Sequence, residues 1–188
     1  MEVYLIRHTK VGLASGVCYG QSDVALADSF AADINVVLEK LKTQLHAAPL
    51  VFSSPAQRCI QLASQINPQI EIVPALQELN FGVWEMCPWA ELPLEETNPW
   101  MENFVEQKPP KGESFQELQT RASTFFNTLP QLEQSPIVII AHAGSIRSII
   151  CHAIGLPLSK AFQIELDYGS ITKLVYRWGL WNLKFLNL

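Results

Sequence analysis

The run of five apolar residues from Ile137 to Ala141, which follows Pro136, constrains the fold of this chain more than any other feature. A short apolar run rich in β-branched residues is typical of a buried strand, and it is far shorter than the roughly 18–20 apolar residues that cross a bilayer. The sequence His-Ala-Gly at 142–144 ends the run, and a helix pattern extends from about Ser145 to Ile154. The sequence therefore predicts a buried strand that leads directly into a helix, with His142 at the junction.

The same unit, a short apolar strand with polar residues after it, occurs twice more. Val3 to Ile6 ends at Arg7–His8, and Leu50 to Phe52 is followed by Ser54–Gln57. A capping serine, proline at the first helical position and glutamine at the third are typical of a helix start. This start places Arg58 in the first turn of a helix, just after a strand end.

The rest of the chain is divided by hydrophobic periodicity and turn residues. We expect a helix over about 28–45 with Asp28 as its cap, a strand over 70–73, an irregular stretch over about 77–99, a helix from the capping box at 114–117 to about Leu132, and strands over 172–178 and 180–185. Strands that alternate with helices through short connections favour an α/β fold, here a three-layer α/β/α sandwich with a mostly parallel mixed sheet. The length of 188 residues fits a single domain, residues 1–188, with a lid-like excursion at about 77–113.

Composition argues against several classes of protein. With 13 Lys and Arg against 18 Asp and Glu, the net charge of −5 argues against a nucleic-acid partner. The four cysteines include no Cys-x-x-Cys pair, so we expect reduced, packed cysteines and no metal. The amino end lacks the basic and apolar regions of a signal peptide, which favours a cytoplasmic protein with no membrane partner. A homodimer through the final strands is a further expectation.

Two arginines and two histidines share one structural position, the carboxyl end of a predicted strand or the first turn of the helix after it. These residues are Arg7, His8, Arg58 and His142. Ligands bind at this edge of parallel sheets, and arginine matches phosphate oxygens with a planar fork of donors, so phosphate is the expected guest. A neutral histidine there can attack phosphorus, and a carboxylic acid must then protonate the leaving oxygen. Glu78 is the expected acid, with Glu85 as a second candidate.

Four motifs resemble those of the histidine phosphatase superfamily, which has the phosphoglycerate-mutase-like fold. They occur in the family's order at Leu5–Thr9, Ser53–Arg58, Leu76–Glu85 and Ala141–Arg147. The resemblance implies that His8 is a phosphohistidine nucleophile and that Glu78 is an acid and later a base. It implies that Arg7, Arg58 and His142 hold the phosphoryl group. Further substrate contacts are expected from Thr9, Gln21, Ser22, Ala143 and Gly144.

The resemblance also implies a reaction on a small-molecule phosphate ester that needs no metal and no cofactor. A narrower likeness to α-ribazole phosphatases rests on residues 18–24, 112–115 and 162–174. It implies release of the 5′-phosphate of α-ribazole during cobalamin nucleotide-loop assembly. One alternative is a phosphoglycerate mutase or sugar-phosphate phosphatase of the same fold. Another is a weakly active regulator that binds a phosphorylated ligand, because Thr9 and Ala143 stand where the family usually has glycine.

Two further features allow more than one interpretation. The aromatic residues Trp84, Trp89, Trp100 and Phe104 either pack against one another or stack on a flat ring such as benzimidazole. Arg147, one turn past His142, either pairs with a carboxylate or contacts the substrate.

Overall fold

A six-stranded sheet in the order β3-β2-β4-β1-β5-β6 forms the centre of the computed structural model, which describes residues 1–132 and 136–188. The strands are β1 (Glu2–Arg7), β2 (Leu50–Ser53), β3 (Ile70–Ile72), β4 (Ile137–Ala141), β5 (Ile171–Arg177) and β6 (Leu180–Phe185). Neighbouring strands from β3 to β1 are parallel, whereas β5 is antiparallel to β1 and β6 is antiparallel to β5. The sheet is therefore mixed and mostly parallel, as the sequence predicts.

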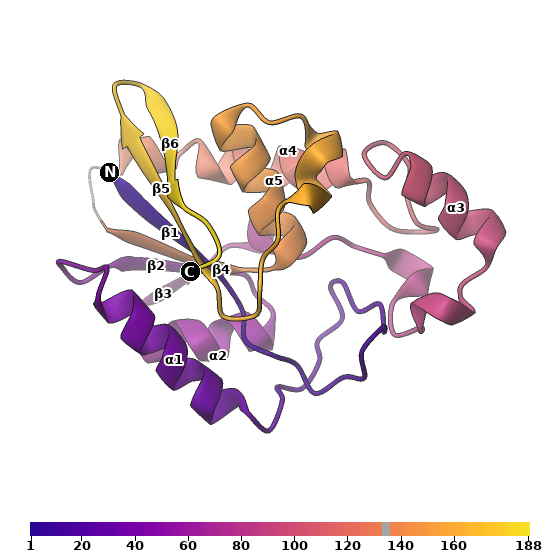
Figure 1. The fold of residues 1–188 in the computed structure, drawn as a ribbon, viewed down its shortest axis with the longest axis horizontal. Helices are drawn as coiled ribbons and strands as arrows, with labels where there is room; N and C mark the ends of the chain where they lie inside the picture. The colour runs from indigo at the N-terminus through magenta and orange to yellow at the C-terminus, as the bar shows by residue number, and fades with distance from the viewer. Residues whose placement is uncertain (133–135) are drawn as a thin grey trace.

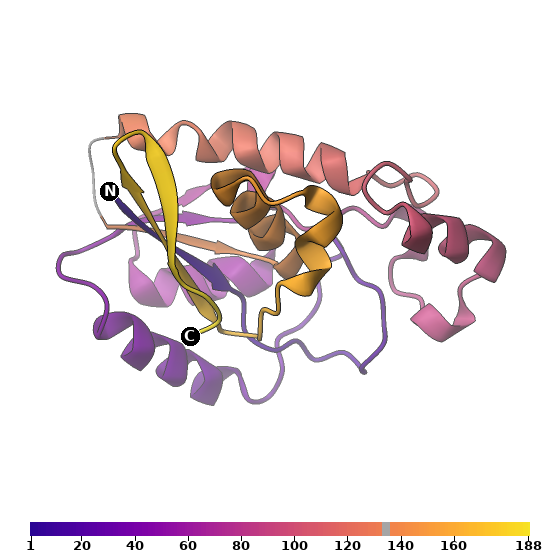
Figure 2. The ribbon, with the colours of Figure 1, turned by 45° about the horizontal axis from the view of Figure 1, so that its top comes forward.

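Helices cover both faces of the sheet (Figure 1). The helices are α1 (Phe30–Lys42), α2 (Gln57–Ile66), α3 (Leu94–Glu102), α4 (Phe115–Phe126) and α5 (Ala143–Ile154). Figure 2 shows α4 and α5 on one side of the sheet and α1 and α2 on the other. Alternation along β1 accounts for both layers, because Val3 and Leu5 belong to the core under α4 and α5, whereas Tyr4 and Ile6 belong to the core under α1 and α2. This arrangement confirms the predicted three-layer sandwich.

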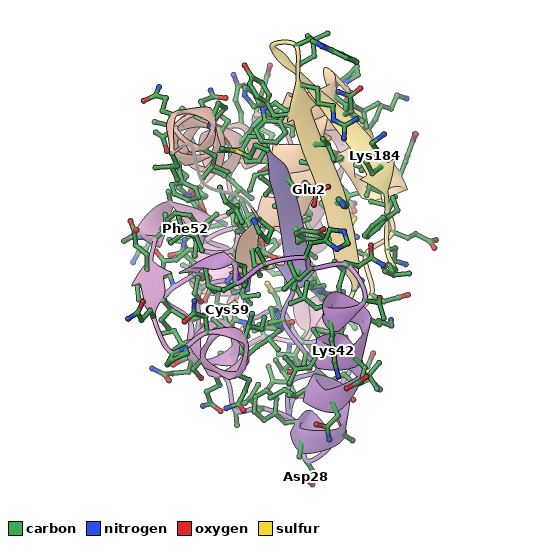
Figure 3. The ribbon with its side chains drawn as sticks, turned by 90° about the vertical axis from the view of Figure 1, so that its left-hand side faces the viewer. Glu2, Asp28, Lys42, Phe52, Cys59 and Lys184 are labelled. Carbon is green, nitrogen blue, oxygen red and sulfur yellow. The ribbon has the colours of Figure 1, made fainter. Side chains whose placement is uncertain are left out.

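Figure 3 shows the same layers from the side, with Asp28 and Lys42 marking the two ends of the α1 region. Short 3-10 helices complete the fold: η1 (Pro74–Leu76), η2 (Gly82–Trp84), η3 (Trp89–Glu91), η4 (Leu129–Gln131) and η5 (Leu158–Gln163). None of the helices among the described residues has the length and apolar content needed to span a membrane.

The central strand and the helix after it follow the sequence prediction closely. Every residue of β4 is fully buried, as expected for a strand between two helix layers. The α5 helix begins at Ala143, two residues earlier than predicted, because His142 takes the N-cap position in an extended conformation. The helix ends at Gly155, whose φ of 68° only glycine adopts at low cost.

Two predicted helix starts are wrong. The α1 helix begins at Phe30 behind Ser29, so Asp28 is not its cap. The α2 helix begins at Gln57 with Ala56 as N-cap, three residues after Ser54. The Ser54 hydroxyl accepts a long hydrogen bond of 3.4 Å from the Ala56 amide, before the helix begins, and lies 2.8 Å from Nε2 of His142.

Two helix ends also differ from the sequence expectations. The α1 helix stops at Lys42 rather than at about 45, and the main-chain carbonyl of Gln44 accepts a hydrogen bond from the Tyr4 hydroxyl. The α4 helix has the predicted capping box, in which Ser114 and Glu117 bond each other's backbone. It ends at Phe126, and the chain continues through η4 rather than as a regular helix to Leu132.

The stretch predicted to be irregular over 77–99 contains regular structure. Besides η2 and η3 it holds most of α3, which includes Pro99 within the helix. Proline inside a pattern signals a helix break, but here it lies late in a nine-residue helix that is held by aromatic packing around Trp100. Figure 1 shows α3 projecting away from the sheet, so the excursion is structured and lies to one side of the layers.

The two carboxyl-terminal strands are found as predicted and form a hairpin, but Trp178 belongs to the turn rather than to the first strand. Trp178 and Gly179 have φ values of 54° and 78°, which match the turn that suits the twist of two-residue hairpins. β6 is an outer strand of the sheet. The homodimer through these strands stays a prediction.

Candidate active site

The two histidines singled out by the sequence lie side by side at the carboxyl ends of neighbouring strands. β1 and β4 pair in register with Arg7 opposite Ala141, so the next residues, His8 and His142, follow at the same edge. The His8 amide donates a hydrogen bond of 3.0 Å to the Ala141 carbonyl. The two ring centroids are 5.1 Å apart, and both side chains are buried. Strand register alone therefore brings together residues separated by most of the chain.

The His8 ring is held in one tautomer by its own main chain. Its Nδ1 lies 2.8 Å from the Thr9 carbonyl oxygen, which can only accept a hydrogen bond. Nδ1 therefore carries the proton, and Nε2 keeps its lone pair. Burial, reinforced by the positive charges of Arg58 and Arg7, holds the pKa of His8 well below its ordinary value. The ring is thus neutral and nucleophilic at physiological pH.

Arg58 is fully buried in the first turn of α2, as the sequence predicts. Its guanidinium donates to the main-chain carbonyls of Ser22 and Gly20 at 2.9 and 2.7 Å. Its Nε has no hydrogen-bond partner within the described residues, and the ion pairs found there do not include Arg58. A buried guanidinium with neutral partners and a spare donor is suited to an anion.

Arg7, at the end of β1, resembles Arg58 in its hydrogen bonding. Its Nη1 donates to the Leu166 carbonyl at 2.6 Å, and its guanidinium stacks 3.7 Å from the centroid of the Tyr168 ring. Its Nε also has no partner in the described part of the chain. Arg7 and Arg58 therefore leave donors available next to His8.

His142 is fixed by residues from the neighbouring strand end and helix. Ser54, at the end of β2, holds its Nε2, and the Cys59 sulfur lies 3.6 Å from the same atom. Burial, the adjacent His8 ring and Arg58 hold the pKa of His142 well below its ordinary value. The role of Ser54 toward His142 was missed by sequence reasoning, which took the serine for a helix cap.

Glu78 reaches the same region from the loop after η1. Its carboxylate accepts hydrogen bonds from the amides of Leu79 at 2.8 Å and Gly144 at 2.9 Å. A Cβ atom at Gly144 would collide with this carboxylate. Gly144, which was expected to contact substrate, instead leaves space for the Glu78 carboxylate and donates its amide hydrogen bond to it.

Glu85, the second candidate acid, is engaged elsewhere. Its carboxylate accepts from the amides of Gln21, Ser22 and Phe81 at 2.9, 2.6 and 3.1 Å, and from the Ser22 hydroxyl. These bonds hold the loop whose carbonyls support Arg58. A carboxylate with this many donors around it is a structural acceptor, so the geometry favours Glu78 over Glu85.

The other residues expected to contact substrate differ in whether their polar groups are already bonded within the protein. The Gln21 side chain donates to the Glu78 carbonyl at 3.0 Å, and the Ser22 hydroxyl donates to Glu85. Thr9 is fully buried beside His8, and its hydroxyl has no partner among the described residues. Ala143 lines a cavity with Glu78. Of this group, Thr9 is the one whose buried hydroxyl, next to His8, lacks a partner among the described residues.

Sequence reasoning missed a pair of tyrosines above the arginines. The Tyr19 ring lies 5.2 Å from the Arg58 guanidinium, and the two hydroxyls of Tyr19 and Tyr168 are 3.0 Å apart. Tyr168 also contacts the His8 ring, with centroids 5.6 Å apart. Tyr19 and Tyr168 lie within segments 18–24 and 162–174, which resemble α-ribazole phosphatases. This resemblance is the one sequence signal that pointed to them.

A small cavity of about 120 Å³ opens beside Glu78, with Ala143, Arg147 and Phe162 in its lining. A larger and almost entirely apolar groove of about 400 Å³ is a neighbour of this cavity, and the two share Phe81 and Phe162 in their linings. The residues that line this aromatic groove are Phe81, Trp89, Trp100, Met101, Phe104 and Phe162. The aromatic residues thus pack on one another and also expose one apolar wall.

Arg147 lines the cavity beside Glu78 and lies against Phe162 of the aromatic groove. Its Nε donates to the Ile164 carbonyl at 2.8 Å, and its guanidinium lies 5.5 Å from the Phe162 ring centroid. Within residues 1–132 and 136–188 it forms no ion pair. The interpretation in which Arg147 pairs with a carboxylate is therefore not supported.

This geometry suits phosphoryl transfer: a neutral buried histidine, two arginines with spare donors, and a carboxyl group at the same strand edge. Within the described residues, no three His, Cys, Asp or Glu side chains are grouped as metal ligands would be. The chain belongs to the histidine phosphatase superfamily (branch 1), whose family model matches residues 3–188. Members of this family are phosphatases that act on phosphate esters, and the chain is such an enzyme.

Among its relatives is the adenosylcobalamin/alpha-ribazole phosphatase of Escherichia coli, 27% identical over 181 residues that cover 90% of this chain and 87% of the relative. A protein of Hydrogenobacter thermophilus named "Putative phosphoserine phosphatase 2" is 25% identical over 195 residues, 99% of this chain and 95% of the relative. The crystal structure of the alpha-ribazole phosphatase from Shigella flexneri superposes with a TM-score of 0.90 at 24% identity, covering 100% of this chain and 96% of that one. At this identity the superposition establishes the fold.

Proposed function

We propose that this enzyme hydrolyses a phosphomonoester through a phosphohistidine on His8. The observation that carries the proposal is the hydrogen bond from Nδ1 of His8 to the Thr9 carbonyl, which leaves Nε2 unprotonated beside Arg7 and Arg58. Nε2 attacks phosphorus, the N–P bond forms, and the P–O bond to the leaving group breaks. Glu78 gives its proton to the departing oxygen, which leaves as an alcohol.

In the second step, water attacks the phosphorus of the phosphohistidine. The Glu78 carboxylate, now unprotonated, accepts a proton from this water as the N–P bond breaks. Orthophosphate leaves and Nε2 regains its lone pair. Arg7, Arg58 and His142 hold the phosphoryl oxygens in both steps, and the two arginines offset their negative charge. Thr9 adds its free hydroxyl to the same oxygens.

The sequence of subsites supports α-ribazole 5′-phosphate as the substrate. The leaving oxygen has to lie on the Glu78 side of the phosphate, where the cavity lined by Arg147 shares Phe81 and Phe162 with the aromatic groove. Phosphate, then a polar sugar beside Arg147, then a flat ring against Trp and Phe side chains is the order of groups in a nucleoside 5′-phosphate. Phosphoserine is too small to extend beyond the cavity beside Arg147 and would leave the aromatic groove empty, so the groove favours an ester with a flat ring. We therefore propose residues 77–113 as a wall of the leaving-group site within one domain, residues 1–188.

The test is phosphate release from α-ribazole 5′-phosphate in the presence of a chelator, with phosphoserine, 3-phosphoglycerate and glucose 6-phosphate alongside. We expect the highest kcat/KM on the ribazole ester, and loss of turnover in the His8→Ala variant. His46→Ala changes an exposed histidine after α1 and serves as the matched control.

The other outcomes each identify a different function. Equal release from all four esters would retain the histidine mechanism and reject the ribazole assignment. Transfer of phosphate within 3-phosphoglycerate would indicate a mutase. Binding of the esters without turnover by the unaltered chain would indicate the regulator, and a trapped acid-labile phosphoenzyme that is absent from His8→Ala would reject it.

A further inference from the structure

Arg121, on α4, uses all its donors in bonds to Glu113 and to the loop that carries Glu78. Arginine has five N–H donors. Nε and Nη2 donate to the two carboxylate oxygens of Glu113 at 3.0 and 2.6 Å, which is a bidentate ion pair. The remaining donors bond main-chain carbonyls of the segment 75–78. Nη1 donates to the carbonyls of Ala75 and Gln77, both at 2.8 Å, and Nη2 donates to the carbonyl of Glu78 at 2.9 Å. No donor is left over, so the guanidinium fits this loop in one geometry.

Glu113 extends the same contacts to the other side of Glu78. Its Oε1 also accepts a hydrogen bond from the Asn80 amide at 2.9 Å. The pair Glu113 and Arg121 therefore holds the main chain both before and after Glu78. The Gln21 side chain adds a further bond to the Glu78 carbonyl.

The Glu78 side chain is held by main-chain amides and not by a bonded cation among the described residues. Its carboxylate accepts from two main-chain amides, those of Leu79 and Gly144, and it forms no ion pair within the described residues. A carboxyl group that must give and take a proton benefits from this freedom from a fixed cation. Its position is then set by the backbone that Arg121 holds.

We propose that Arg121, held by Glu113, is the positioning residue that orients Glu78 for proton transfer to the leaving oxygen. This inference rests on the proposed acid role of Glu78. Arg121 touches carbonyls of the loop and not the reacting atoms, so it acts through Glu78. Lysine in its place offers a single point of charge and cannot bond Glu113 and three carbonyls together.

The test uses a series of substituted phenyl phosphates, from phenyl phosphate to p-nitrophenyl phosphate. These esters share their shape and differ in the acidity of the leaving phenol, so a well-placed acid matters most for phenyl phosphate. The quantity measured is kcat/KM, which reports the steps up to leaving-group departure whichever later step limits kcat.

For Arg121→Lys we expect kcat/KM on phenyl phosphate to fall about 30-fold, with less than about 3-fold loss on p-nitrophenyl phosphate. Glu78→Gln should show the same trend with a larger slope. Arg177→Lys, at the exposed end of β5, is the matched control and should behave as the unaltered chain on every ester. Should Arg121→Lys not fold, Glu113→Gln provides the same readout, because its amide keeps the bond from Asn80 and loses one acceptor for Arg121.

The controls separate two ways of failing. If Glu78→Gln loses activity by one factor on all esters, the acid role of Glu78 fails, and the positioning role fails with it. If Glu78→Gln shows the expected slope but Arg121→Lys and Glu113→Gln lose activity uniformly or not at all, the positioning role alone is overturned.

Discussion

The pocket proposed to hold phosphate, formed by Arg7, His8, Arg58 and His142, lies near the aromatic groove but is built in a different way. The pocket residues follow strands or begin helices, and paired backbone holds them in register. The aromatic groove belongs to the excursion and η5, which lie outside the sheet and are held by loop backbone bonds and by side-chain bonds such as that from the Trp84 indole to Glu96. Sheet pairing therefore fixes the positions of the pocket residues. Residues that line the aromatic groove can be substituted without a change in the sheet.

The first prediction concerns the pocket and has the largest expected effect. Arg58→Met keeps an unbranched apolar stem and removes a buried cation that forms no ion pair among the described residues. We expect kcat/KM to fall about 10³-fold because phosphoryl charge in the transition state loses its donors. Free phosphate, which should raise the Tm of the unaltered enzyme, should no longer raise that of the variant. A variant still stabilised by phosphate would show that anion binding does not depend on this residue.

The second prediction concerns the junction between the two regions. Gly144→Ala places a methyl group against the Glu78 carboxylate and should displace it. We expect kcat/KM for phenyl phosphate to fall about 10²-fold, with a smaller loss for p-nitrophenyl phosphate. Retention of full activity on both esters would mean that Glu78 acts from another position.

The third prediction isolates the aromatic groove. Phe162 is half exposed, so Phe162→Ala should change recognition with little loss of stability. We expect kcat/KM for α-ribazole 5′-phosphate to fall about 10-fold, with no change for glucose 6-phosphate. Leu94→Ala, on the exposed face of α3, is the control of similar exposure and hydrophobicity. A parallel loss on both substrates would reject the division into pocket and groove.

The fourth prediction concerns the pH dependence of the free energy of unfolding that His8 causes. Burial and the nearby arginines lower the pKa of His8, so below its ordinary pKa of about 6.5 the unfolded chain binds more protons than the folded one. Stability should therefore rise with pH up to that value and decline as pH falls below it. His8→Asn should reduce the slope of unfolding free energy against pH by up to about 1.4 kcal/mol per pH unit, measured by urea unfolding. An unchanged slope would contradict the buried neutral state of His8.

The smallest effect is expected at the outer surface of the excursion. Lys108 and Glu117 form an ion pair with both side chains about half exposed to solvent. Lys108→Met should change the free energy of unfolding by no more than about 0.5 kcal/mol and leave activity unaltered. A larger loss in urea unfolding would show that outer contacts also hold the excursion in place.

The predictable parts of the fold are those that local sequence determines. An apolar run bounded by Pro136 and His142 predicts β4, and the Ser114–Glu117 capping box predicts the start of α4. The positions of Arg7, His8 and His142 follow because strand ends of a parallel sheet share one edge. These signals need only a few neighbouring residues.

The parts that local sequence did not reveal depend on contacts between distant residues. Ser54 has the sequence context of a helix cap, and only the neighbouring strand end shows that it holds His142. Arg121 lies in a regular helix pattern, and no nearby residue indicates that it will reach Ala75 to Glu78. Helix α3 was missed because Pro99 indicates a helix break in the sequence. The aromatic packing that stabilises the helix becomes visible only in the structure.

The place of β1 in the sheet has a consequence for how the molecule forms. β1 is paired on one side with β4 and on the other with β5, so residues near the start of the chain wait for partners beyond residue 136. Pairings of such long sequence separation form slowly, and an apolar strand without partners promotes aggregation. On a ribosome, Val3 to Ile6 would emerge long before either partner strand. Since His8 directly follows β1, phosphate binding should appear only after the central strands have joined, which makes it a reporter of completed folding.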